Sequence, residues 1–539
     1  MNDPQGIEVV KELRRHHHHH GEGEGEDHLD KKLDEHQKEG AAAAAAATTT
    51  TTTTTATTVT LARSWIFEKA PTIMGGLTTP KKQDLSLLTK LDLPNCNLTS
   101  FPESFHLAVP NLSILFCPKN KFSEIPAEIG LCPKLQMVSF KECHTITSIH
   151  PDALQPQLRW LILTGNLISN IPDTISRCTK LQKWMLSGNK LTSLPTREVM
   201  RSLTNLELVR LACNDLTEPP TSLLKLPNLR WAAFASNPFL PHSSNNNNAT
   251  TTNADVDVDE SVDSKLQILD DPSLEDTSWP VLGQGAGGVT RKVSGWTTTS
   301  SSRKRKHVSG GDEKDEDEDD KTEESVAVDV AAKMYAGELT SDGSPQDEKM
   351  IATRLATAFP DEPAMIHVYG ETKTKGGLVM EFLEGYEALA GPPSFDTCSR
   401  DVYDLTDHCK LLLMTPSYCW KIATSMLRVL TELHKLGICH GDFYAHNILI
   451  KPSTQDVKLS DFGAAFCYHK DEPYGKFIER TEVRSFEVLV NELYTNYVVG
   501  QNEGDNKKWQ MLMKECEKDD ATFESLCKQF VDVDADGSN

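Results

Sequence analysis

Leucines recur at a regular period between residues 88 and 240. Copies of the pattern L-x-x-L-x-L-x-x-N/C-x-L begin 23 to 25 residues apart, at Leu88, Leu112, Leu135, Leu158, Leu181, Leu206 and Leu229. Within each copy the alternating leucines predict a short strand whose inward side chains stack on the next copy. We expect the asparagine of each copy to satisfy buried backbone groups where the chain turns: Asn120, Asn166, Asn189, Asn214 and Asn237. The period therefore predicts a curved solenoid with its strands on the concave face.

The outward positions of these strands carry a semi-apolar strip with little charge. Its members are Ile114, Phe116, Met137, Trp160, Ile162, Met185, Arg210 and Trp231. A surface of this kind suits a protein or peptide ligand. The pattern resembles that of leucine-rich-repeat proteins, and we expect about seven repeats over residues 65–242.

Low-complexity sequence divides the rest of the chain. Residues 1–64 hold a five-His run, a Gly-Glu alternation, an Ala run and a Thr tract, and are predicted to be disordered. Residues 243–263 are rich in Asn, Thr and Asp and predict an interdomain linker before a second domain at 264–535. Within that domain, residues 297–325 predict a solvated insertion whose basic stretch, Arg303 to Lys306, is a candidate nuclear-import signal beside an acidic block.

Three motifs in the second domain point to phosphate chemistry. Gly283, Gly285 and Gly288 have the G-x-G-x-x-G spacing that lets backbone approach phosphates, although a dinucleotide fold or a flexible loop has the same spacing. An apolar run then ends in Lys333, as expected of a strand whose ammonium reaches phosphates. Removing the insertion leaves a natural hairpin length between the glycines and this lysine. Glu348, with Asp347 as the alternative, is the candidate ion-pair partner of Lys333.

Further motifs follow in order along the chain. Residues 378–383 predict a buried strand leading into a hinge, where Glu381 and Leu383 would offer backbone groups to an adenine. After an amphipathic helix at about 418–436, Asp442 and Asn447 stand five residues apart, and Asp461-Phe462-Gly463 follows a predicted strand at 457–459.

The order of these motifs resembles that of the protein kinase superfamily, over residues 275–495. From about Leu88 the chain resembles leucine-rich-repeat protein kinases, which implies an α/β protein with a leucine-rich-repeat solenoid and an α+β, two-lobed kinase-like domain. The resemblance implies ATP and Mg²⁺ as cofactors and a protein substrate. Asp442 would accept the substrate hydroxyl proton, Lys333 would hold the phosphates, and Asn447 and Asp461 would bind the metal.

Several positions depart from the kinase pattern. Gly441 replaces the usual Arg, and Tyr444 stands where serine/threonine kinases carry a Lys that touches the γ-phosphate. The Ala-Pro-Glu element is not recognisable, and a helix candidate at Glu482 leaves about forty residues after Tyr494 for the distal helices. Two alternatives therefore stay open: a pseudokinase scaffold that binds nucleotide, and a small-molecule phosphotransferase of the aminoglycoside-kinase type.

Charge and composition limit the partners. The net charge of −23 argues against a general affinity for nucleic acid or anionic membrane. No stretch is apolar enough to span a bilayer and no secretory signal is visible, so we expect an intracellular, cytoplasmic protein. The 13 cysteines lack paired spacing, which favours reduced buried thiols over disulfides or zinc.

Overall fold

The computed structural model describes residues 85–241, 266–285, 287–298, 326–406, 412–499 and 503–531. The predicted disordered N-terminus, the predicted linker and Arg303 to Lys306 lie outside these ranges. We call residues 85–241 the repeat region and residues 266–531 the C-terminal region.

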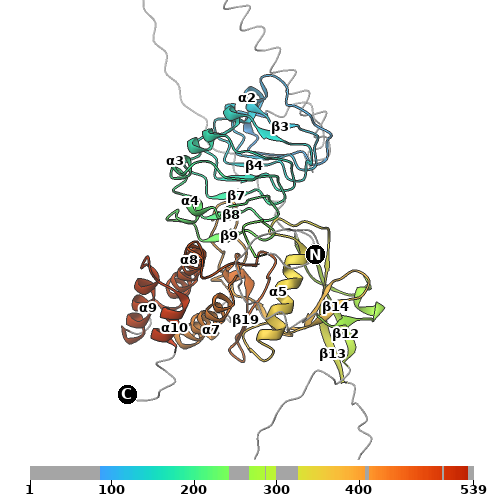
Figure 1. Ribbon diagram of the computed structural model, residues 1–539, viewed down its shortest axis with the longest axis vertical. Coiled ribbons are helices and arrows are strands. Elements are labelled where there is room, and N and C mark those ends of the chain that lie inside the picture. Colours follow the sequence, from blue (N-terminus) through green and yellow to red (C-terminus); the bar gives the residue numbers. More distant parts are fainter. Residues whose placement is uncertain are drawn as a thin grey trace, which may run out of the picture. The chain divides into compact units, whose positions relative to one another are not determined.

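Seven three-residue strands of the repeat region form one parallel sheet in the order β1-β2-β4-β6-β7-β8-β9. Figure 1 shows these strands following one another through the repeat region. Their bounds are Lys90–Asp92 (β1), Ile114–Phe116 (β2), Met137–Ser139 (β4), Trp160–Ile162 (β6), Lys183–Met185 (β7), Leu208–Arg210 (β8) and Trp231–Ala233 (β9). The register is constant, so that Lys90 lies opposite Ile114 and Leu208 opposite Trp231. Each leucine copy therefore supplies one strand.

The asparagines of the repeats bind backbone at the turns, as expected. Asn120 accepts from the N–H groups of Cys96 and Leu98 and donates to the Leu93 carbonyl at 2.7 Å. Asn189 and Asn214 make equivalent bonds three and four repeats further on. These bonds stabilise turns whose backbone polar groups are buried away from water.

Short elements return the chain between the strands. They are the helices α2 (Phe105–Ala108), α3 (Arg197–Met200) and α4 (Thr221–Leu224), the 3₁₀ turns η3 (Ala127–Leu131), η4 (Pro151–Ala153) and η5 (Asp173–Arg177), and the paired strands β3 (Glu124–Ile125) and β5 (Ser148–Ile149). The core between them and the sheet consists of the periodic leucines and of phenylalanines such as Phe101, Phe122 and Phe140.

A six-stranded sheet in the order β10-β14-β15-β13-β12-β11 begins the C-terminal region. Its strands are β10 (Ile268–Leu269), β11 (Val281–Gly285), β12 (Gly288–Thr298), β13 (Val326–Tyr335), β14 (Val368–Thr372) and β15 (Leu378–Glu381). Strands β12 and β13 pair antiparallel from Gly288↔Tyr335 to Thr298↔Val326. The predicted insertion therefore connects the two strands of a hairpin, and its start at 297 was two residues too early because Thr297 and Thr298 belong to β12.

Helix α5 (Pro345–Ala358) follows this hairpin and carries Glu348 in its first turn. The hydroxyl of Ser344 caps it by accepting the Asp347 N–H, and Pro345 stands at the first helical position, where no N–H is needed.

The remaining elements are mainly helical. They are α7 (Pro416–Lys435), α8 (Gly475–Leu493), a π-helical turn at Tyr494–Val498, α9 (Glu503–Cys516) and α10 (Phe523–Phe530), with β16 (Glu387–Ala388), β17 (Ile438–Cys439), β18 (Ile448–Lys451), β19 (Asp456–Leu459) and β20 (Phe466–Cys467) between them. The apolar face of α7, which includes Ile422, Met426 and Leu430, is fully buried in the core of this part. Among the described residues no helix combines the length and apolarity that crossing a membrane requires.

One sequence-based expectation needs adjustment, whereas the expectation of free, buried cysteines agrees with the described residues. The helix candidate at Glu482 begins seven residues earlier, at Gly475, so Glu482 lies inside α8 and is buried. The cysteines resolved among the described residues are free, and most are buried.

Candidate active site

Lys333 occupies the centre of the site. It extends from β13, between Thr290 of β12 and Leu378 of β15. Its Nζ lies 2.6 Å from Oε1 of Glu348 and 3.5 Å from Oδ1 of Asp461. Burial alone lowers the pKa of Lys333, but the Asp461 and Glu348 carboxylates outweigh it and raise the pKa, so the ammonium stays charged. The predicted pair with Glu348 is therefore present, whereas Asp347 bonds to Ser236 and Ser344 instead.

The glycine-rich segment forms the turn between β11 and β12. A Cβ at Gly288, whose φ is +145°, would lie 2.1 Å from the Met334 carbonyl oxygen, so only glycine fits there. Hypothetical Cβ atoms at Gly283 and Gly285 meet nothing within 4 Å. Gly283 and Gly285 therefore leave open space beside the strand, as a phosphate-covering loop requires.

A cavity of about 620 Å³ joins these groups. Its wall includes the glycine segment, Lys333, Glu348, Asp461 and the end of β15 from Met380 to Leu383. This volume lies in the range of small-molecule and cofactor sites. At the β15 end, the Glu381 N–H donates to the His367 carbonyl at 2.9 Å, so this amide is already engaged in the sheet.

The loop from His440 to Asn447, here the 440–447 loop, carries the predicted proton acceptor. The Nδ2 of Asn447 donates to the Asp442 carbonyl at 2.9 Å and to its Oδ2 at 3.2 Å. With its nitrogen turned to Asp442, the Asn447 side chain retains its carbonyl oxygen as a potential metal ligand. Neither Asp442 nor Asn447 lines the 620 Å³ cavity.

Asp461 follows β19 with a φ of +57° and a side chain that is 55 % exposed. Ser460 next to it donates from both its N–H and its hydroxyl to the Asn447 carbonyl. The hairpin β18–β19 thus connects the two predicted metal ligands, and an open carboxylate with an amide oxygen is the donor set that Mg²⁺ accepts.

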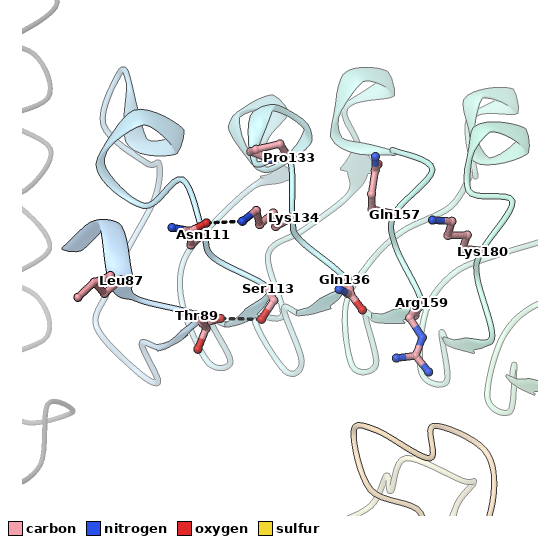
Figure 2. Close-up of a pocket in the computed structure, with 10 residues that line it drawn as sticks. All are labelled: Leu87, Thr89, Asn111, Ser113, Pro133, Lys134, Gln136, Gln157, Arg159 and Lys180. Carbon is pink, nitrogen blue, oxygen red and sulfur yellow. Dashed lines mark hydrogen bonds between the residues drawn. The ribbon is translucent and has the colours of Figure 1, made fainter. Parts of the chain in front are cut away.

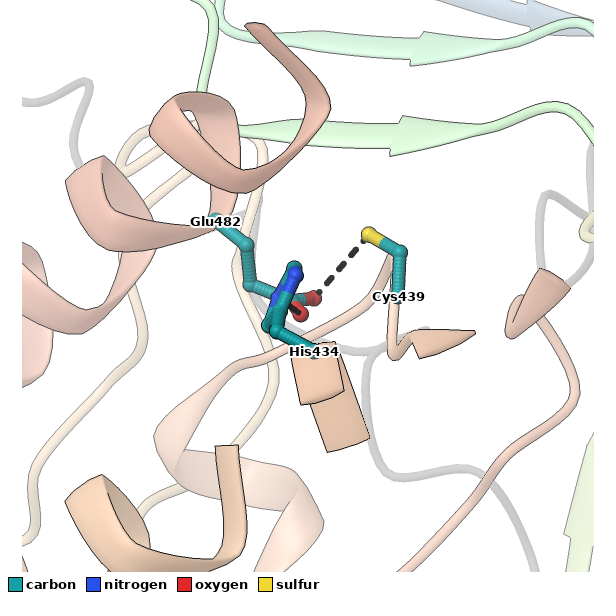
Figure 3. Close-up of side chains that lie close together, drawn as sticks. All are labelled: His434, Cys439 and Glu482. Carbon is teal, nitrogen blue, oxygen red and sulfur yellow. Dashed lines mark hydrogen bonds and ion pairs between the residues drawn. The ribbon is translucent and has the colours of Figure 1, made fainter. Parts of the chain in front are cut away.

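Glu482 holds the 440–447 loop, and Figure 3 shows its side chain beside those of His434 and Cys439. Its carboxylate accepts the N–H groups of His440 at 3.1 Å and Gly441 at 2.8 Å, and it lies 2.7 Å from Nε2 of His434. Cys439 contributes a further contact at 3.4 Å. Burial raises the pKa of Glu482, but the bond to His434 and the nearby charges outweigh it and hold the pKa below its ordinary value. The sequence pattern gave Glu482 no role, since nothing local marks it as the partner of a loop forty residues earlier.

Arg210 of β8 is the second group that the sequence patterns did not single out for this site. Its guanidinium bonds to Oδ1 of Asp442, to the Gly441 carbonyl at 3.0 Å and to Oδ1 of Asp342 at 2.8 Å. The predicted ligand strip of the repeats therefore meets the C-terminal region at its end. Trp160, from the middle of that strip, also contacts this region by a bond to the Cys398 sulfur.

A second cavity, of about 650 Å³, lies on the repeat region (Figure 2). Polar side chains from successive repeats line it, and Lys134 donates to Asn111 at 2.6 Å. Three of the lining residues are cations, namely Lys134, Arg159 and Lys180. The groove is thus locally basic on a chain whose net charge is strongly negative.

Residues 319–499 match the family model of the protein kinase domain. This match begins before β13 and ends after α8, so it includes Lys333, Glu348, the 440–447 loop and Asp461. The glycine-rich segment precedes the matched part of the kinase domain.

Curated relatives agree with this match. The chain is 36% identical over 72 residues to glycogen synthase kinase 1 of Pyricularia oryzae. It is 37% identical over 76 residues to glycogen synthase kinase 3 of Trypanosoma brucei brucei. It is 34% identical over 73 residues to the protein kinase MCK1 of Saccharomyces cerevisiae. These alignments cover 13 to 14% of this chain. The chain spans only about a fifth of the length of these relatives, 18 to 22%.

Proposed function

We propose that this chain is a protein kinase that transfers the γ-phosphate of ATP to serine or threonine hydroxyls of a protein substrate. The observation that carries the proposal is the contact of Lys333 with Glu348 and Asp461 at the wall of a nucleotide-sized cavity. The kinase-domain match and the kinase relatives support the same assignment.

In this proposal each group has a role set by its chemistry. Lys333, oriented by Glu348, binds the α- and β-phosphates, the segment Gly283 to Gly288 covers the phosphates, and the chain from Glu381 to Leu383 lies along the adenine. Asn447 and Asp461 hold Mg²⁺, which neutralises the charge of the transferring group when bound. Asp442 accepts the hydroxyl proton of the substrate, and Glu482 fixes the loop that carries it.

We further propose that residues 65–242 form a leucine-rich-repeat solenoid that binds a protein or peptide ligand, and that 264–535 form the two-lobed kinase unit. The regular step of 23 to 25 residues between copies and the parallel strands in constant register support a solenoid. The ligand would use the N-terminal strands, at the half-buried Ile114 and Phe116, and the adjacent basic groove. An acidic peptide has the charge that this groove complements.

One observation favours the alternative of a nucleotide-binding pseudokinase, namely the occupation of Asp442 by Arg210. A single assay separates the two functions. The purified full chain is incubated with γ-labelled ATP, Mg²⁺ and a generic protein substrate, beside the variants Asp442→Asn and Lys333→Met. Transfer by the wild-type chain that both variants lose supports the kinase, whereas nucleotide binding without transfer supports the pseudokinase.

A further inference from the structure

The repeat region covers the face of the 440–447 loop that carries the proton acceptor. Asp442 has both carboxylate oxygens engaged, Oδ1 by Arg210 and Oδ2 by Asn447, and its side chain is only 18 % exposed. Arg210 itself is 3 % exposed. A substrate hydroxyl must come within hydrogen-bond distance of a general base, and here Arg210 holds Oδ1 of Asp442 while Asn447 bonds to Oδ2.

Trp231 of β9 extends this contact along the loop. Its ring stacks on Tyr444 with centroids 4.1 Å apart and planes 5° apart, and its Nε1 donates to the Phe443 carbonyl at 2.8 Å. Tyr444 is buried in one cluster with Trp231 and Leu208. The contact thus combines a buried ion pair with an aromatic stack, a combination that makes strong interfaces.

Both departures of this loop from the kinase pattern lie in the contact. A Cβ at Gly441 would stand 2.9 Å from the Ala232 carbonyl oxygen of β9 and 2.6 Å from that of Ala464, and its φ is +74°. An Arg there is incompatible with the packing of β9. Tyr444, in place of a Lys, supplies the ring on which Trp231 stacks. Gly441 and Tyr444 therefore both fit against β9, and Gly441 fits against Ala464 as well.

The same contact continues beyond the loop. Glu207 of the repeat region pairs with Arg400 at 2.7 Å, and Ser236 donates to Asp347 at 2.7 Å, next to Glu348 in the first turn of α5. The nucleotide cavity is nevertheless not lined by any residue of the repeat region. The repeats thus cover the proton acceptor without lining the place proposed for ATP.

We propose that the repeat region is an autoinhibitory cover, in which Arg210 and Trp231 block access of the protein substrate to Asp442 while nucleotide still binds. This inference rests on the proposed kinase function. A protein ligand of the repeats activates the enzyme by competing for the face that holds the loop, so the ligand needs contacts with β8 or β9 as well as with the N-terminal strands.

The test compares Arg210→Gln and Trp231→Phe with the wild-type full chain. Gln keeps most of the length and polarity of Arg, and Phe keeps an aromatic ring without the indole N–H. Lys90→Ala is the matched control, since it removes a cation from the same sheet at β1, where the side chain lies over Phe116. The measurements are kcat/KM for a generic protein substrate, the Kd of a non-hydrolysable ATP analogue, and amide hydrogen exchange over residues 438–447.

We expect Arg210→Gln to raise kcat/KM at least about tenfold, because losing one partner of a buried ion pair shifts such an equilibrium by at least that factor. Trp231→Phe acts in the same direction with a smaller rise. Exchange over 438–447 becomes faster in both variants, and the nucleotide Kd stays within about twofold of the wild-type value. Lys90→Ala changes none of these quantities.

A folded Arg210→Gln variant with unchanged or lower kcat/KM overturns the cover and makes Arg210 a positioning residue for Asp442. Transfer by no variant above the Lys333→Met background means instead that the kinase function has failed. In that case hydrogen exchange still tests whether the repeat region covers the loop. Unchanged protection of residues 438–447 in both variants would contradict such a cover.

Discussion

Nζ of Lys333 lies 2.6 Å from Oε1 of Glu348, and the two side chains are 14 % and 9 % exposed. Removing this cation takes away phosphate positioning, so we expect Lys333→Met to lower phosphoryl transfer by at least about 10²-fold. Asp461→Asn removes a metal ligand and has a comparable effect. The rates are measured with labelled ATP on samples whose circular dichroism matches the wild-type chain. Lys349→Met is the control, because Lys349 pairs with Glu371 and does not line the cavity. Undiminished transfer by either variant would show that the site lies elsewhere.

We expect the insertion between β12 and β13 to be dispensable for catalysis. Thr298 and Val326 are the last paired residues of the hairpin, so replacing 299–325 by Asn-Gly closes it with a favoured two-residue turn. We expect the rate of transfer to stay within about twofold, since closing a shorter loop changes stability only slightly. The transfer rates of the wild-type chain and the deletion variant are compared once their thermal unfolding temperatures are shown to be similar. A folded deletion variant that loses turnover would assign the insertion a role in docking or catalysis.

We expect activity not to depend on phosphorylation between residues 464 and 481. The three hydroxyl side chains of that segment, Tyr468, Tyr474 and Thr481, are buried, and each makes a hydrogen bond. Gly441 has no side chain to pair with a phosphate there. Treatment of the purified chain with a broad phosphatase should leave the transfer rate unchanged. Loss of rate that returns on rephosphorylation of this segment contradicts the prediction.

We expect Glu492 to make the free energy of unfolding depend on pH. Burial and then the nearby Asp401 raise its pKa from 4.5 to about 7, although Tyr403 donates a hydrogen bond to it at 3.1 Å. Between these two values the folded chain holds a proton that the unfolded chain has released. The free energy of unfolding therefore decreases as pH rises from about 4.5 through 7.

We expect Glu492→Gln to remove this dependence. The variant should be more stable than wild type by about 1–2 kcal/mol at pH 8 and nearly equal at pH 5, as measured by urea unfolding. Glu472→Gln, at an exposed position, is the control. Equal differences between variant and wild type at both pH values would refute the assignment to Glu492.

Local pattern was sufficient to predict much of the fold and of the site. The leucine period predicted one strand per repeat, and the motif order predicted the pair of Lys333 and Glu348. Such features depend on neighbours in sequence or on spacing within one hairpin. The bond of Arg210 to Asp442 joins residues 232 positions apart, and no periodicity contains that information. The early start of α8 was missed because neither Tyr474 nor Gly475 is a helix-starting residue and no side chain caps that end.

The close packing of the Ala232 carbonyl against Gly441 limits how chimeras of this chain can be built. A repeat array from another protein, joined to this C-terminal region, would meet a loop whose Gly441 and Tyr444 pack against β9 of this chain. Conversely, restoring an Arg at 441 without changing the last repeat introduces a clash with two backbone carbonyls. Strand β9 and the 440–447 loop thus have to be exchanged together, and the boundary for a viable chimera lies N-terminal to β6, because Trp160 also contacts the C-terminal region.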